Sequence, residues 1–239
     1  MTNKELFQSV GFVGKYYSEM RDFYVDYFKS EEDMLAFFVK VFKNDENDKK
    51  SRQMMNQIKN LVSIANDIDK IRPARDPLRI FFIRICLEAL YAISEISKTE
   101  FFEKFPSYIS SEGQEYILNN FLLTGFEDEY KNFRYEEIHD LTIDDFFEII
   151  RVVRNIVAHE GTYWEMQFFA HDNDSTWISK LITDRKILKS YEYKNPNKML
   201  RTYSFETKLE YDRFVYYFVE ACINFLLEYI EKKGATKSE

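Results

Sequence analysis

Glycine, proline and cysteine are scarce in this chain. Its 239 residues include only six glycines and four prolines, so few positions favour a turn or interrupt a helix. This scarcity predicts long helices joined by short connections. The two cysteines, Cys86 and Cys222, lie inside apolar runs and show no CxxC or Cys/His spacing. We therefore expect two buried free thiols, with neither a disulfide framework nor a zinc site.

Long apolar runs and targeting segments are missing too. No stretch reaches the roughly 18 consecutive apolar residues of a membrane span, and residues 1–5 lack the basic-then-apolar pattern of a signal peptide. The sequence thus predicts a cytoplasmic protein with no membrane span. The formal net charge of −8 disfavours a general nucleic-acid binder. Residues 179–201 nevertheless carry seven basic and two acidic side chains, which fits either a solvated surface or a local contact with a polyanion.

Large apolar side chains are abundant. They make up 45% of the chain, and the aromatic share of 18% includes 23 Phe and 17 Tyr, which is enough to fill a core and too much for wholesale disorder. Apolar residues recur at spacings of three and four along most of the sequence. This pattern predicts an all-α fold, a helical bundle with a small β-hairpin insertion near residues 185–205.

The predicted elements follow from the same periodicity. Pro73 and Pro77 separate a predicted N-terminal helical extension (1–72) from a helical bundle (73–233), which a disordered tail (234–239) follows. Helices are expected over about 7–27, 30–41, 54–68, 78–98, 143–160 and 207–232, with two shorter ones within 100–140. Composition favours strands over 177–182, 187–193 and 199–205, with a turn at 194–198.

The helix at 143–160 carries the candidate chemistry. Thr142 and Asp145 have the spacing of a capping box at its start, and Gly161 is placed to end it. Each residue of a helix advances about 100°, so polar side chains gather on one side, opposite an apolar face. The polar set is Glu148, Arg151, Asn155 and His159, with Arg154 beside them. An imidazole can move protons, and a guanidinium can bind a phosphate and offset its charge. The alternative is a solvated helix face with internal ion pairs.

The run Arg154-Asn155-Ile156-Val157-Ala158-His159 resembles the motif of the HEPN superfamily (higher eukaryotes and prokaryotes nucleotide-binding domains). The resemblance covers about residues 76–232 and implies an all-α bundle with the motif at a helix end. It further implies a metal-independent endoribonuclease without a cofactor, acting as a homodimer, of the kind found in bacterial toxins and antiphage effectors. Other members of the superfamily are non-catalytic modules, which here would bind RNA, a nucleotide or a partner protein. One toxin branch has Tyr two residues after the motif His, where this chain has Gly161.

The resemblance assigns catalysis to Arg154, His159 and Asn155, and the polar face of the helix adds Arg151 and Glu148 in support. Glu88, a charged residue in a strongly apolar predicted helix, is a candidate to orient Arg154; an Arg84–Glu88 pair within that helix is the alternative. Lys186, Lys189 and Lys194 are the predicted RNA-binding residues. His139 and His171 are expected on the surface. RNA, a second copy of the chain, and an antitoxin or other regulatory partner are the predicted partners.

Overall fold

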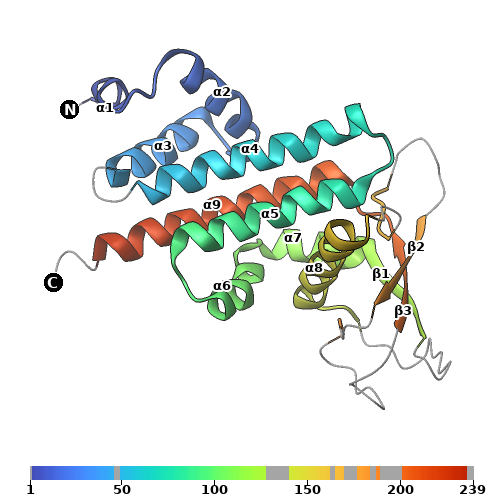
Figure 1. Ribbon diagram of the computed structural model, residues 1–239. Helices are drawn as coiled ribbons and strands as arrows, with labels where there is room; N and C mark the ends of the chain where they lie inside the picture. Colours follow the sequence, from blue (N-terminus) through green and yellow to red (C-terminus); the bar gives the residue numbers. More distant parts are fainter. Residues whose placement is uncertain are drawn as a thin grey trace. The chain divides into compact units, whose positions relative to one another are not determined.

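The computed structural model describes residues 2–45, 49–127, 140–161, 165–169, 177–183, 187–188 and 201–235 (Figure 1). Helices make up most of this part of the chain, and a small antiparallel sheet accompanies them. The predicted fold class, all-α with a small β insertion, is therefore confirmed. The helices are α1 (Asn3–Ser9), α2 (Gly14–Tyr24), η1 (Val25–Tyr27), α3 (Glu31–Asp45), α4 (Lys50–Ile71), α5 (Asp76–Ser94), α6 (Lys98–Lys104), η2 (Phe105–Tyr108), α7 (Ser111–Asn120), α8 (Ile143–Glu160) and α9 (Tyr211–Ala235). None of these described helices is long and apolar enough to cross a membrane.

The first predicted helix, 7–27, is divided in the structure. Helix α1 ends at Ser9 and α2 begins at Gly14. Gly11 and Gly14 have φ angles of +69° and +58°, a left-handed conformation that glycine adopts without steric cost. Apolar residues recur at spacings of three and four across this break, although Val13, the residue before α2, is 48% exposed. Spacing alone therefore could not distinguish one helix from two.

The sheet contains strands β1 (Phe121–Glu127), β2 (Trp177–Thr183) and β3 (Arg201–Thr207) in the order β1-β3-β2. Both pairings are antiparallel, and β1 has a register shift between Leu123 and Gly125. The strands predicted over 177–182 and 199–205 correspond to β2 and β3. Strand β1 was not predicted, and it follows the two short helices expected in that region, α6 and α7. The predicted turn at 194–198 and residues 189–193 lie outside the described residues.

The described chain forms two compact units, each assembled from separate segments: residues 1–63, 86–108 and 218–239, and residues 64–85 and 109–217. The sequence-based division at residues 72/73 stays a prediction. In the first unit, Phe12 packs against Phe38 and Phe42, with ring centroids 5.2 and 4.3 Å apart. Cys86 and Cys222 are buried free thiols, as predicted.

The second unit holds the sheet and α8 around an aromatic core. Phe121 of β1 stacks on Phe205 of β3 with centroids 4.9 Å apart and meets Phe146 of α8 edge-on at 5.3 Å. Phe146 in turn lies 5.7 Å from Phe214 of α9. Aromatic pairs of this kind contribute roughly 0.5–1.5 kcal/mol each beyond their buried area. One face of α8 is therefore held by the sheet and by the start of α9.

Gly113 of α7 is a position in this second unit where only glycine fits. A Cβ atom there would lie 2.7 Å from Cδ1 of Tyr217 and 2.8 Å from Cγ2 of Ile109. The Tyr217 ring is held in place because its hydroxyl donates to Glu112 Oε1 at 3.0 Å. Alanine would gain helix propensity but would force a packed ring to move.

We expect Gly113→Ala to lower the free energy of unfolding by about 1–2 kcal/mol, since overpacking costs roughly 1–3 kcal/mol and the propensity gain offsets up to about 1. Chemical denaturation measures the change. Glu115→Ala, on an exposed position of the same helix, is the matched control and should shift stability by less than about 0.5 kcal/mol. A Gly113→Ala protein as stable as the wild type would contradict this account of the packing.

Candidate functional site

Helix α8 has well-defined ends. The hydroxyl of Thr142 accepts a hydrogen bond from the Asp145 backbone N–H at 3.2 Å, and the Asp145 carboxylate accepts one from the Thr142 N–H at 3.0 Å. These two bonds form the predicted capping box. At the other end, Gly161 adopts the left-handed conformation, with φ 65° and ψ 21°. Both termini are thus defined by local features, which determine the residues at which the helix begins and ends.

The apolar and polar faces of α8 differ in burial, as the sequence predicted. The apolar face is buried and comprises Phe146, Phe147, Ile149, Ile150, Val152, Val153, Ile156 and Val157. Among the polar residues, Glu148, Arg151, Arg154 and Asn155 are half-buried, whereas His159 is exposed. The helix therefore has one side anchored in the second unit and one polar side that solvent can reach.

Arg151 and Glu148 form a pair on the polar side. Arg151 Nε donates to Glu148 Oε2 at 2.7 Å, and its Nη2 donates to Oε1 of the same carboxylate. This fork raises the pKa of Arg151 above its ordinary value, through hydrogen bonding to Glu148 against the opposing cost of burial. With its charge offset by the carboxylate, Arg151 contributes little net positive charge to the site.

Arg154 and Asn155 are joined directly. Arg154 Nη1 donates to Asn155 Oδ1 at 3.2 Å, and the guanidinium carbon lies 5.9 Å from the ring centroid of Phe81 of α5. The ring face attracts the cation at this distance, although weakly. The amide oxygen and the ring together restrict the guanidinium orientation. The amide of Asn155 therefore orients the guanidinium of Arg154.

His159 lies in the last turn of α8, two residues before Gly161. It follows Asn155 by four positions, and residues spaced in this way share one side of a helix. Arg154 precedes it by five positions, about 7.5 Å along the helix axis. A cation at a helix C-terminus is also favoured by the helix dipole, which is the structural reason that a His could stand here without any catalytic task.

No family model, no curated protein and no solved structure matches this chain. The proposed function therefore rests on the residues and geometry of α8.

The described structure does not bring the remaining predicted residues together at α8. Glu88 belongs to the first compact unit and α8 to the second, so its pairing with Arg154 stays a prediction. Lys186, Lys189 and Lys194, like His139 and His171, lie outside the described residues. Among the described residues, no group of three or more His, Cys, Asp or Glu side chains is arranged to hold a metal ion.

A second polar cluster was missed by the sequence analysis. Asp76, at the start of α5, accepts a hydrogen bond from the Phe168 backbone N–H at 2.8 Å and another from Arg79 Nη1 at 3.1 Å. The Arg79 guanidinium lies 3.6 Å from the ring centroid of Tyr211, whose hydroxyl donates to Asn66 at 2.8 Å. Asp76, Arg79, Phe168 and Tyr211 border a cavity of about 330 Å³. The Asp76/Arg79 spacing was visible in the sequence, but the contact with Phe168, distant in sequence, was not.

Proposed function

We propose that the protein is a metal-independent endoribonuclease of HEPN type, in which His159 and Arg154 of α8 act on RNA. The observation that carries the proposal is the placement of Arg154, Asn155 and His159 on the last turns of α8, where Asn155 accepts a hydrogen bond from Arg154. The guanidinium is oriented by the amide, and the imidazole is exposed to solvent. A positioned cation and an accessible acid–base group are the two kinds of group that promote cleavage at a phosphate.

The chemistry needs few groups because RNA supplies its own nucleophile. The 2′-oxygen attacks the adjacent phosphorus, forming the 2′-O–P bond while the bond from phosphorus to the 5′-oxygen breaks. One imidazole accepts the proton of the 2′-hydroxyl, and a second donates a proton to the departing 5′-oxygen. Arg154 offsets the charge that develops on the phosphoryl oxygens. The products are a 2′,3′-cyclic phosphate and a 5′-hydroxyl.

Two imidazoles imply two copies of the chain, since α8 contributes one His159. We therefore propose a homodimer in which two α8 helices face a shared cleft. Lys186, Lys189 and Lys194 are proposed to guide RNA through their positive charge. A cytoplasmic location, a role as a toxin or antiphage effector, and control by an antitoxin or other regulatory partner belong to the same proposal.

The alternative is a non-catalytic module that binds RNA, a nucleotide or a partner protein. Two contacts favour it. Arg151 is already held by Glu148, and Arg154 is half-buried between an amide oxygen and an aromatic ring. In such a module the polar side of α8 would be a recognition surface, and His159 would have no catalytic role.

Incubation of purified protein with single-stranded RNA in EDTA distinguishes the two. The enzyme should cleave RNA with the chelator present, and the 3′ ends should carry a 2′,3′-cyclic phosphate because the attacking oxygen belongs to the RNA. Analytical sedimentation of the same preparation should show a dimer. RNA in which the 2′-hydroxyls are methylated is the matched control and should stay intact. Retarded migration of RNA that remains uncut would instead support the binding module.

A further inference from the structure

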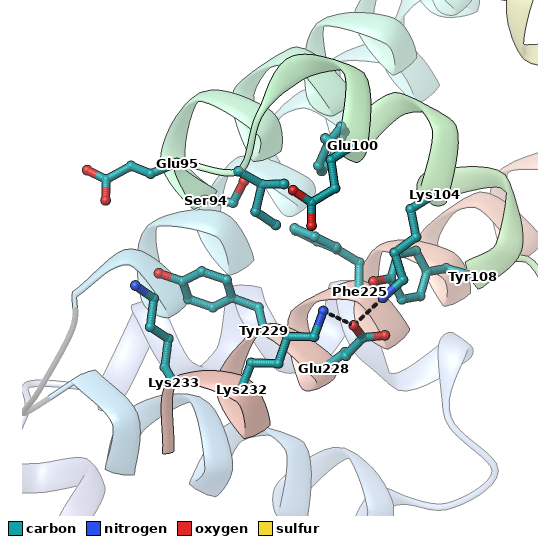
Figure 2. Close-up of a pocket in the computed structure, with 12 residues that line it drawn as sticks. Ser94, Glu95, Glu100, Lys104, Tyr108, Phe225, Glu228, Tyr229, Lys232 and Lys233 are labelled. Atoms are coloured by element: carbon teal, nitrogen blue, oxygen red, sulfur yellow. Dashed lines mark hydrogen bonds and ion pairs between the residues drawn. The ribbon is translucent and has the colours of Figure 1, made fainter. Parts of the chain in front are cut away.

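A cavity of about 280 Å³ lies wholly within the first unit, lined by residues of the end of α5, of α6 and η2, and of the last turns of α9 (Figure 2). Its apolar part is aromatic. Phe101 and Phe225 are each 2% exposed, and Tyr229 is 5% exposed. The Phe101 and Phe225 rings meet edge-on at 5.1 Å, and Tyr108 lies 5.6 Å from Phe225. Because these rings are packed against one another, the cavity exists before any ligand arrives.

One side of the cavity carries a bridge of charged groups. The Glu228 carboxylate accepts hydrogen bonds from Lys104 and, at 2.7 Å, from Lys232. These two hydrogen bonds, of which the one from Lys104 has the larger effect, lower the pKa of Glu228 to about 2. Burial, aided by a hydrogen bond to Glu228, raises the pKa of the Tyr108 hydroxyl. At neutral pH the bridge therefore contains two ammonium groups for one carboxylate, which leaves an excess of positive charge.

The other charged groups of the cavity leave this excess in place. Lys233 lies 5.8 Å from the Tyr229 ring centroid, and Glu100 points into the cavity in Figure 2. Glu95 points away from the cavity and is paired with Lys50 (Figure 2). Three ammonium groups thus face two carboxylates. The Lys232 side chain is 61% exposed and that of Glu228 is 32% exposed, so an entering ligand can reach them.

We propose that this cavity binds a small organic anion with one flat ring. The ring lies against Tyr229 and Phe225, and the acidic group, a phosphate or a carboxylate, takes hydrogen bonds from Lys232 and Lys233. Ligand sites for drug-sized molecules occupy roughly 300–1,000 Å³. A cavity just below that range accommodates a single ring system with one acidic group. The proposal is independent of RNA cleavage, because every residue in it belongs to the other compact unit.

Calorimetric titration of the full chain with five simple probes tests the chemistry. Phenyl phosphate and benzoate should bind with dissociation constants on the order of 1 mM or below, as expected for ligands of about ten heavy atoms. Inorganic phosphate, which lacks the ring, and benzyl alcohol, which lacks the charge, should bind at least about fivefold more weakly. Comparing the two anions shows which acidic group is preferred. The proposal would be overturned if benzylamine bound best, if benzyl alcohol bound as tightly as benzoate, or if neither aromatic anion bound.

Variants locate the site. Replacing Lys232 and Lys233 together with Gln should weaken phenyl phosphate binding about tenfold, whereas Glu228→Gln should tighten it about two- to fivefold. That substitution removes the carboxylate that competes with the ligand for Lys232. The free energy that a partly exposed ion pair contributes corresponds to about this change in affinity. Lys40 forms a surface ion pair in which its Nζ lies 3.9 Å from Glu231 Oε1. Lys40→Gln is therefore the matched control and should bind phenyl phosphate like the wild type. Tighter binding cannot result from a damaged fold, so weaker or unchanged binding by Glu228→Gln would overturn the assignment.

Discussion

Replacing His159 with alanine is expected to slow RNA cleavage by about 10²–10⁴-fold, which is what a positioned acid–base group typically contributes. The side chain is exposed in the last turn of α8, so its removal should change stability by less than about 0.5 kcal/mol. Single-turnover cleavage of a labelled RNA measures the rate. Thermal unfolding of the same samples measures the stability.

Arg154→Ala should slow cleavage by a comparable factor, about 10²–10³-fold, because the charge that offsets the developing oxyanion is lost. Asn155→Ala should have a smaller effect, since it removes the group that orients Arg154 and leaves the guanidinium in place. Glu160→Ala, next to His159, and Arg21→Ala, at an exposed pair with Glu31, are the matched controls and should cleave at the wild-type rate. A His159→Ala protein that cleaves as fast as these controls would remove the imidazole from the mechanism.

The sequence was sufficient to predict α8 because the features that define its ends and its two faces are local. The capping box, the left-handed Gly161 and the alternation of apolar and polar faces all arise within the helix or one residue beyond its ends. The Arg151–Glu148 fork is also a short-range contact, three positions apart. Such contacts depend on helix geometry alone, so periodicity and spacing are enough to anticipate them.

The features that escaped prediction depend on contacts far apart in the chain. Strand β1 exists because it pairs with β3, where Phe121 lies opposite Thr207. Its seven residues follow α7 directly. The bridge at Glu228 joins residues 124 positions apart. Neither pairing leaves a signal in a single sequence, because a strand or an ion pair of this kind is stabilised by its partner.

Asp76→Ala is expected to have the largest effect on stability, lowering the free energy of unfolding by about 3–5 kcal/mol. The Asp76 and Arg79 side chains are only 10% and 15% exposed, and removing Asp76 leaves the largely buried Arg79 guanidinium with the Tyr211 ring but without its carboxylate partner. The Phe168 N–H would also lose its acceptor in a buried position, which costs roughly 1–3 kcal/mol within that total. Chemical denaturation in the presence of a reducing agent gives the value.

Asp67→Ala provides the matched control. Asp67 pairs with Lys70 at the same spacing of three residues, but its side chain is 56% exposed and that of Lys70 is 79% exposed. Exposed pairs contribute roughly 0–1 kcal/mol, so this variant should remain close to the wild type. Equal losses for Asp67→Ala and Asp76→Ala would show that burial of the pair is not what makes Asp76 important.

Asp76→Asn separates the hydrogen bonds from the charge. Burial raises the pKa of Asp76, despite the opposing hydrogen bonds from Phe168 and Arg79. A carboxyl whose pKa is higher in the folded than in the unfolded state contributes stability that is complete below its unfolded pKa and is lost as the pH rises through the folded value. Asparagine cannot titrate and keeps an oxygen for the Phe168 N–H. Asp76→Asn should therefore cost less than Asp76→Ala, and its deficit relative to the wild type should shrink between about pH 3 and pH 7. A deficit that grows over that range would mean that the ionised Asp76–Arg79 pair, rather than the anchored Phe168 backbone, dominates this cluster.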